Sequence, residues 1–98
     1  MKVTIQSIHF TAATRLQAYI EQKLNKLDQF FDKIVGGNVI LRVQPEGKGM
    51  NKYVEIHVSV PGDLLVAREE GRTFEEATDL VMDKLKSQLK RYKGRLQQ

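Results

Sequence analysis

The chain has 98 residues, of which 41% are hydrophobic and 29% are charged, as is usual for a single globular domain. It contains no cysteine, which excludes disulfides, thiolate catalysis and a cysteine-based zinc site. The net charge of +4 is uneven, because residues 84–98 hold six Lys or Arg and no acid. We expect a cytoplasmic protein with no membrane partner, since no apolar run approaches the ~18 residues of a membrane span and no leader sequence is visible.

The first third of the chain predicts a strand followed by a long amphipathic helix. Apolar and polar residues alternate over residues 2–7, as in a half-buried strand. The helix should run to Phe31 and be capped by Thr11 or Thr14. Its apolar stripe consists of Leu16, Ile20, Leu24, Leu27 and Phe31. One flank of the stripe is formed by Arg15, Tyr19, Lys23, Lys26 and Phe30, and the other includes Glu21 and Asp28.

Three further strands are predicted between residues 38 and 69. Segments 38–44 and 53–60 alternate between apolar and polar residues, so each strand should bury one face. We expect Gly36 and Gly37 to supply a positive φ for the reversal that precedes these strands. A polar turn is predicted over 45–49, and the sequence Pro61-Gly62-Asp63 predicts a tight reversal into a strand over 64–69.

The last helix is predicted over residues 73–98. Thr73 is expected to cap it, with Glu76 at the capping-box position. Its apolar face consists of Phe74, Ala77, Val81, Leu85, Leu89, Tyr92 and Leu96. Acids in the first half and cations in the second suit the helix dipole, but six cations over about three turns exceed what the dipole alone would favour. The excess indicates a polyanionic partner.

The element order is β-α-β-β-β-α, which predicts an α+β fold. Short connections favour antiparallel hairpins for the last three strands, so both helices should cover one face of a four-stranded sheet. The other face should be solvated. We expect a single domain over residues 1–98.

Polar residues of the two helices suggest an RNA-binding surface. Along the last helix, a stripe beside the apolar face is formed by Lys84, Gln88, Arg91 and Arg95. Lys23 and Lys26 form a comparable flank on the first helix. If the helices lie side by side, we expect two basic ridges to border a shared groove and hold RNA backbones. The alternative is a solvated helix surface whose lysines serve solubility.

The sequence offers no set of residues for catalysis. His9 and His57 are the only histidines, and His57 should lie on the exposed polar face of a strand beside Glu55 and Ser59. Nucleophile elbows, paired histidine ligands and dinucleotide-binding glycines are not found. We therefore predict a non-enzymatic protein with no catalytic residues, no metal, no cofactor and no small-molecule substrate.

Two motifs carry a family resemblance. The pattern LxxYIxxKLxKLxxFFD over residues 16–32, together with TFEEAxDLxxDKLxxQLxxYK over 73–93, resembles the ribosome hibernation-promoting factors and the related ribosome-associated inhibitor, protein Y. The resemblance covers essentially the whole chain. It implies a fold similar to double-stranded-RNA-binding domains and a protein that binds the small ribosomal subunit in stationary phase or stress. Such proteins lie in the channel between head and body, block messenger and transfer RNA, and inhibit translation.

The resemblance also implies individual RNA-binding positions. Family basic residues map onto Lys23, Lys26, Lys84 and Arg91, and Gln88 also matches. Ser87 stands where the family pattern has an arginine. Long family members carry an added C-terminal domain that pairs ribosomes, so we expect this chain to be a short form without that domain and monomeric off the ribosome.

Two other functions fit the sequence. One is a general double-stranded-RNA-binding domain without preference for ribosomes. The other is a protein-interaction module that uses the open face of the sheet, where Tyr53, Glu55, His57 and Ser59 should lie.

Overall fold

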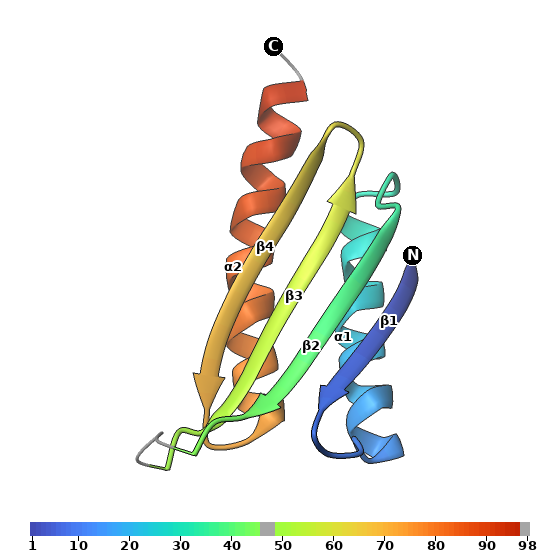
Figure 1. The fold of residues 1–98 in the computed structure, drawn as a ribbon. Coiled ribbons are helices and arrows are strands. Elements are labelled where there is room, and N and C mark those ends of the chain that lie inside the picture. The colour runs from blue at the N-terminus through green and yellow to red at the C-terminus, as the bar shows by residue number, and fades with distance from the viewer. Residues whose placement is uncertain (46–48, 97–98) are drawn as a thin grey trace.

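The computed structural model describes residues 1–45 and 49–96. Its elements are β1 (Lys2–Ile8), α1 (Thr14–Phe30), β2 (Gly36–Val43), β3 (Lys52–Val60), β4 (Asp63–Gly71) and α2 (Phe74–Leu96) (Figure 1). The predicted α+β class and the order β-α-β-β-β-α are confirmed. The middle of the predicted 45–49 turn, residues 46–48, and the last two residues of the predicted final helix, 97 and 98, lie outside the described residues.

The four strands form one sheet in the order β1-β2-β3-β4. The last three strands pair antiparallel, as predicted, while β1 pairs parallel to β2. A parallel pair needs a crossover, which is supplied here by α1. Both helices lie on one face of the sheet, with α2 over β3 and β4 (Figure 1). The predicted arrangement of the two helices is therefore confirmed.

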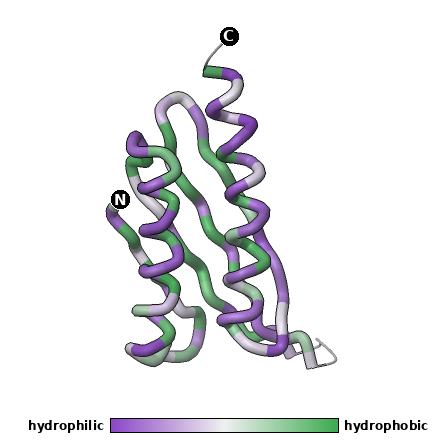
Figure 2. Tube along the Cα trace, turned by 180° about the vertical axis from the view of Figure 1, so that it is seen from behind, coloured by the Kyte–Doolittle hydropathy of each residue, from purple (hydrophilic) through white to green (hydrophobic). Residues whose placement is uncertain are grey.

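The core lies between this face of the sheet and the helices. The apolar stripe of α1 contributes Ile20, Leu24 and Leu27, which are almost fully buried. The sheet and α2 contribute Val39, Leu41, Val54, Ile56, Val58, Val81, Leu85 and Leu89. Figure 2 shows hydrophobic segments along the strands that the helices cover. Because the strands alternate, every second residue is left for the opposite face of the sheet.

The glycines near the start of β2 do not have the predicted role. Gly36 and Gly37 belong to the strand, and the positive-φ glycines among the described residues are Gly49 and Gly62. A Cβ at Gly37 would lie 3.1 Å from the Met1 sulfur and 3.5 Å from Leu24 Cδ1. Glycine at this position therefore makes room for side chains packed above the strand. Gly62, with φ of 78°, forms the predicted reversal between β3 and β4.

The two helices begin differently. Thr73 caps α2, as predicted, because the Glu76 backbone N–H donates to Thr73 Oγ1 at 3.0 Å. The predicted cap of α1 is wrong: Ala13 occupies the N-cap position, and no described side chain caps it. Neither Thr11 nor Thr14 therefore plays the capping role. None of the described helices is long and apolar enough to cross a membrane.

Candidate nucleic-acid interface

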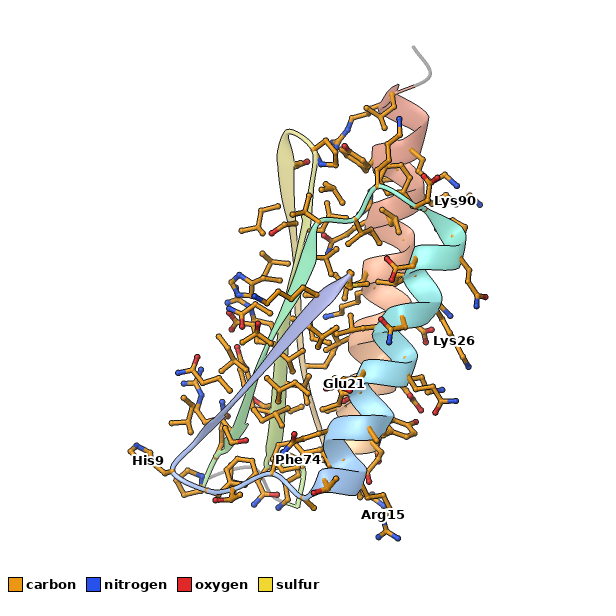
Figure 3. All side chains as sticks on the ribbon, turned by 90° about the vertical axis from the view of Figure 1, so that its right-hand side faces the viewer. His9, Arg15, Glu21, Lys26, Phe74 and Lys90 are labelled. Atoms are coloured by element: carbon orange, nitrogen blue, oxygen red, sulfur yellow. The ribbon has the colours of Figure 1, made fainter. Side chains whose placement is uncertain are left out.

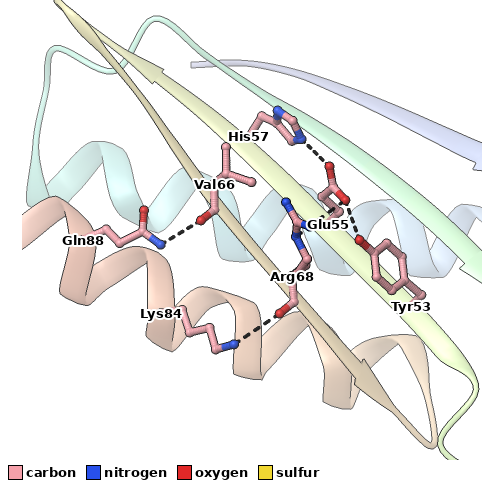
Figure 4. Close-up of polar contacts among 7 residues, drawn as sticks. All are labelled: Tyr53, Glu55, His57, Val66, Arg68, Lys84 and Gln88. Atoms are coloured by element: carbon pink, nitrogen blue, oxygen red, sulfur yellow. Dashed lines mark hydrogen bonds and ion pairs between the residues drawn. The ribbon is translucent and has the colours of Figure 1, made fainter.

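One flank of α2 lies along the edge strand β4. Lys84 Nζ lies 2.6 Å from Glu69 Oε2 and 3.3 Å from the carbonyl oxygen of Arg68. One turn later, the Gln88 amide donates to the carbonyl oxygen of Val66 at 2.8 Å (Figure 4). Edge-strand carbonyls are free to pair with another chain unless something covers them. Lys84 and Gln88 occupy these two acceptors, so both side chains help to close the sheet edge.

The same flank continues to the turn between β3 and β4. The Arg95 guanidinium donates to Asp63 Oδ2 at 2.9 Å. Arg91 and Gln88 line a hollow of about 210 Å³ together with Asp63, Leu64, Leu65 and Arg95. We call Lys84, Gln88, Arg91 and Arg95 the β4-edge stripe. Of these four, only Arg91 has no hydrogen bond or ion pair to a described residue.

The other flank of α2 faces α1. Lys93 Nζ donates to the carbonyl oxygen of Phe30 at 2.8 Å and lies 4.2 Å from the centroid of the Phe30 ring. Lys86 and Lys26 line a common hollow between the two helices. Lys86, Lys90 and Lys93 are spaced i, i+4 and i+7, so they share one flank of α2. We call Lys26, Lys86, Lys90 and Lys93 the interhelical cluster.

The interhelical cluster is largely free of acidic partners. Within the described parts of the chain, none of its four lysines forms an ion pair with an Asp or Glu. Lys26 and Lys90 lie on the outer side of the helices (Figure 3). The Lys93 amine is already held by the Phe30 carbonyl oxygen, whereas those of Lys26, Lys86 and Lys90 have no carboxylate partner among the described residues and remain available to an anion from outside. This end of the interhelical surface is therefore suited to a polyanion.

The opposite end of the interhelical surface has mixed charge. The Tyr19 hydroxyl donates to Asp79 Oδ1 at 2.8 Å, and Lys23 Nζ lies 3.7 Å from the same oxygen. Hydrogen bonding to the Asp79 carboxylate raises the pKa of Tyr19 to about 12. Lys23 is thus paired with an acid, whereas Lys26, one turn later, has no acidic partner within the described part of the chain. The charge along the surface changes from balanced near the start of the helices to positive near their ends.

The open face of the sheet carries a compact polar network. Both Tyr53 and His57 contact the Glu55 carboxylate, each at 2.5 Å, and Arg68 Nε lies 4.0 Å from it (Figure 4). These hydrogen bonds, with that from His57 first, hold the pKa of Glu55 below its ordinary value. Burial and the hydrogen bond to Glu55 raise the pKa of Tyr53. The carboxylate is thus satisfied by its own neighbours on the sheet.

The sequence matches the family described as Sigma 54 modulation protein / S30EA ribosomal protein over residues 3–97. The chain belongs to this family. A relative from Pseudomonas putida named ribosome hibernation promoting factor is 33% identical over 97 residues, which are 99% of this chain and 91% of the relative. The resemblance stated from the two helical motifs is confirmed.

Two solved structures are similar to this fold. A ribosomal subunit interface protein from Coxiella burnetii superimposes with a TM-score of 0.84 and 26% identity, covering 96% of this chain and 99% of that one. The N-terminal domain of Thermus thermophilus protein Y gives a TM-score of 0.81 and 28% identity, covering 94% and 99%. The arrangement of sheet and helices is therefore shared with these two proteins.

The predicted basic residues of the two helices do not face one another in the structure. Lys23 and Lys26 lie on the flank of α1 that faces α2, whereas Lys84, Gln88 and Arg95 contact β4 on the side away from α1. The prediction that the two basic ridges border one groove is wrong. A second basic stripe, which was not predicted, is formed by Lys86, Lys90 and Lys93, and their i, i+4, i+7 spacing could have indicated it. The apolar stripe has two flanks, and its periodicity does not indicate which of them faces α1.

Proposed function

We propose that this chain is a ribosome hibernation factor. It binds the small ribosomal subunit in the channel between head and body, blocks messenger and transfer RNA, and inhibits translation in stationary phase or stress. Membership of the S30EA ribosomal protein family supports this proposal. The names of the relatives support it too, since they refer to ribosome hibernation and to the ribosomal subunit interface.

The observation that carries the proposal is the interhelical cluster. Its four lysines lie near the ends of two parallel helices without an acidic partner among the described residues, and Lys93 alone of the four donates to a described backbone carbonyl, that of Phe30. Structured RNA is recognised largely through its shape, phosphates and sugars, so amines held on a rigid helix pair suit this ligand. Because no described carboxylate has to be given up, contact of these lysines with phosphates should contribute more to binding affinity than contact of the paired cations.

The residues predicted from the sequence are still proposed to bind RNA. The proposed RNA-binding residues are Lys23, Lys26, Lys84, Gln88, Arg91 and Arg95, to which the geometry adds Lys86, Lys90 and Lys93. To contact phosphates, Lys84 would have to leave Glu69 and Arg95 would have to leave Asp63. The loss of these ion pairs lowers the net contribution of both cations to RNA affinity. Lys26 and Arg91 need no such exchange with a described residue. The proposed action is occlusion, and it requires no catalytic residue or cofactor.

Co-sedimentation with separated small and large ribosomal subunits tests the proposal. We expect the purified protein to be retained by small subunits, to be released as salt rises, and to be displaced by a bound complex of messenger and transfer RNA. Each phosphate-contacting cation should add about 0.7 to 0.9 to the slope of log affinity against log salt.

A plain RNA duplex serves as the control competitor in the same assay. A duplex that competes as well as small subunits would favour a general double-stranded-RNA-binding domain. Failure to bind either subunit at low salt would contradict the proposal.

A further inference from the structure

A hollow of about 410 Å³ lies between the ends of the two helices. Its lining consists of Lys26, Leu27, Gln29, Phe30 and Lys86. This volume falls in the range of small-molecule sites, about 300 to 1,000 Å³. The described lining combines two amines, one amide and one aromatic ring, and none of these described residues carries a carboxylate. The hollow is thus suited to a ligand that has a planar ring and negatively charged groups next to that ring.

Phe30 is the unusual member of this lining. Its side chain is 42% exposed, although it is a large apolar residue that would ordinarily be buried. The neighbouring Phe31 packs against Tyr92, with ring centroids 5.5 Å apart and an interplanar angle of 78°. Phe31 therefore fills the core position at the end of α1, and Phe30 is left at the surface beside the hollow.

The Phe30 ring is also held in place. Lys93 Nζ lies 4.2 Å from the ring centroid and is anchored by its hydrogen bond to the Phe30 carbonyl oxygen. Lys93 does not belong to the lining of the hollow. A cation over an aromatic ring restrains its orientation. The ring is thus prepared for contact without having to reorganise when a ligand arrives.

Exposed aromatic rings surrounded by cations suit single-stranded nucleic acid, because bases stack on the ring and amines contact the phosphates. We propose that this hollow binds one unpaired nucleobase of RNA, stacked on Phe30, with Lys26 and Lys86 contacting the phosphates on either side of it. The Gln29 amide offers a donor and an acceptor to the edge of the base. This inference rests on the proposed function and specifies an RNA feature that the protein recognises.

The charge of the lining favours RNA over a protein segment. Lys26 and Lys86, which form no ion pair with a described residue, attract phosphates spaced along a chain, and a free inorganic anion would gain nothing from the aromatic ring. Base stacking on an aromatic side chain contributes about 5- to 150-fold in affinity per base. The ring should therefore distinguish RNA that carries bases from the same backbone without them.

The test compares two RNA probes of equal length and charge, a short oligouridine and an abasic ribose-phosphate chain, by fluorescence anisotropy at low salt. We expect the wild-type protein to bind the oligouridine about tenfold more tightly. Phe30→Leu should abolish this preference and leave the affinity for the abasic chain unchanged. Leu80→Ala, which truncates another exposed apolar side chain, should behave like the wild type.

Phe30→Trp supplies an independent readout, because the chain contains no other tryptophan. Stacking of a base on the introduced indole should quench its fluorescence, and the abasic chain should leave the fluorescence unchanged. Equal affinity of the wild type for both probes, equal losses for both probes in Phe30→Leu, or no quenching by oligouridine would each overturn the inference.

Small-subunit binding separates this inference from the proposed function. If the wild type and Phe30→Leu bind subunits equally well and neither prefers oligouridine, the nucleobase site is wrong while the proposed function stands. If the wild type shows the base preference but binds no subunit, the proposed function is wrong instead. Circular dichroism of each variant should match the wild type, because Phe30 is at the surface.

Discussion

The two flanks of α2 are both basic, yet they differ in what their side chains already contact. Along β4, Lys84 and Arg95 are held by carboxylates and Gln88 is held by a backbone carbonyl. Facing α1, Lys86 and Lys90 contact no acid among the described residues. A count of cations therefore overstates how many are available to a partner. Availability depends on which neighbours the fold places beside each amine.

The largest expected effect is the loss of RNA binding when the free lysines are neutralised. Lys86→Gln with Lys90→Gln should weaken binding to small subunits on the order of 10- to 100-fold and lower the log–log salt slope by about 1.4 to 1.8. The charge-matched control is Lys84→Gln with Arg95→Gln, which removes two cations that are paired in the fold. Salt-dependent co-sedimentation should show a clearly smaller loss for this control. Equal losses would mean that pairing does not limit availability.

A smaller effect is expected on stability when the edge contact of α2 is removed. Gln88→Ala should lower the free energy of unfolding by about 1 kcal/mol, because the Val66 carbonyl loses its donor. Gln22→Ala is the control, since Gln22 is exposed on α1, and it should change stability by less than about 0.5 kcal/mol. Urea denaturation measures both variants. Indistinguishable midpoints would show that Gln88 does not support the sheet edge.

The smallest effect concerns the contact of Tyr19 with Asp79, near the start of the two helices. Tyr19 should ionise with a pKa of about 12 in place of its ordinary value of 10, because its hydroxyl donates to the Asp79 carboxylate. A raised pKa in the folded state means that this contact stabilises the fold below about pH 10 and is lost as the pH rises towards 12. Asp79→Asn should return the pKa of Tyr19 towards 10. Phenolate absorbance, taken as the difference from Tyr19→Phe, reports the titration.

Asp79→Asn also tests whether pairing with a carboxylate limits the contribution of a cation to RNA binding. It removes the carboxylate that lies 3.7 Å from Lys23 Nζ. Lys23 should then resemble Lys26, and affinity for small subunits should rise a few-fold at low salt. Glu21→Gln is the control, because it removes one negative charge from the other flank of α1. An equal gain in both variants would indicate an effect of net charge alone.

Much of the fold could be predicted from local patterns. The period of Leu16, Ile20, Leu24 and Leu27 places one face of α1 in the core, and the alternation in β3 places Val54, Ile56 and Val58 beneath it. Two local predictions were wrong, the cap of α1 and the role of Gly36 and Gly37, and the structure shows a cause for the second. Gly37 is adjacent to Met1 and Leu24, and such contacts between distant segments leave no local signal.

The candidate site was predicted only in part for the same reason. Residue type and spacing located the basic half of α2, and the motifs identified the family. They did not separate Lys84 from Lys86, which are only two residues apart and lie on opposite flanks of the helix. The separation came from the contacts of Lys84 with β4 and from the hollow that Lys86 shares with α1.

By itself, the sequence determined the six elements, the buried side of each element and the excess of positive charge near the end of the chain, because these follow from periodicity and composition along neighbouring residues. The tertiary structure alone decided which cations are paired with a carboxylate and which have no such partner among residues 1–45 and 49–96. That outcome depends on the crossover through α1, which sets one flank of α2 beside another helix and leaves the other flank on the edge of the sheet.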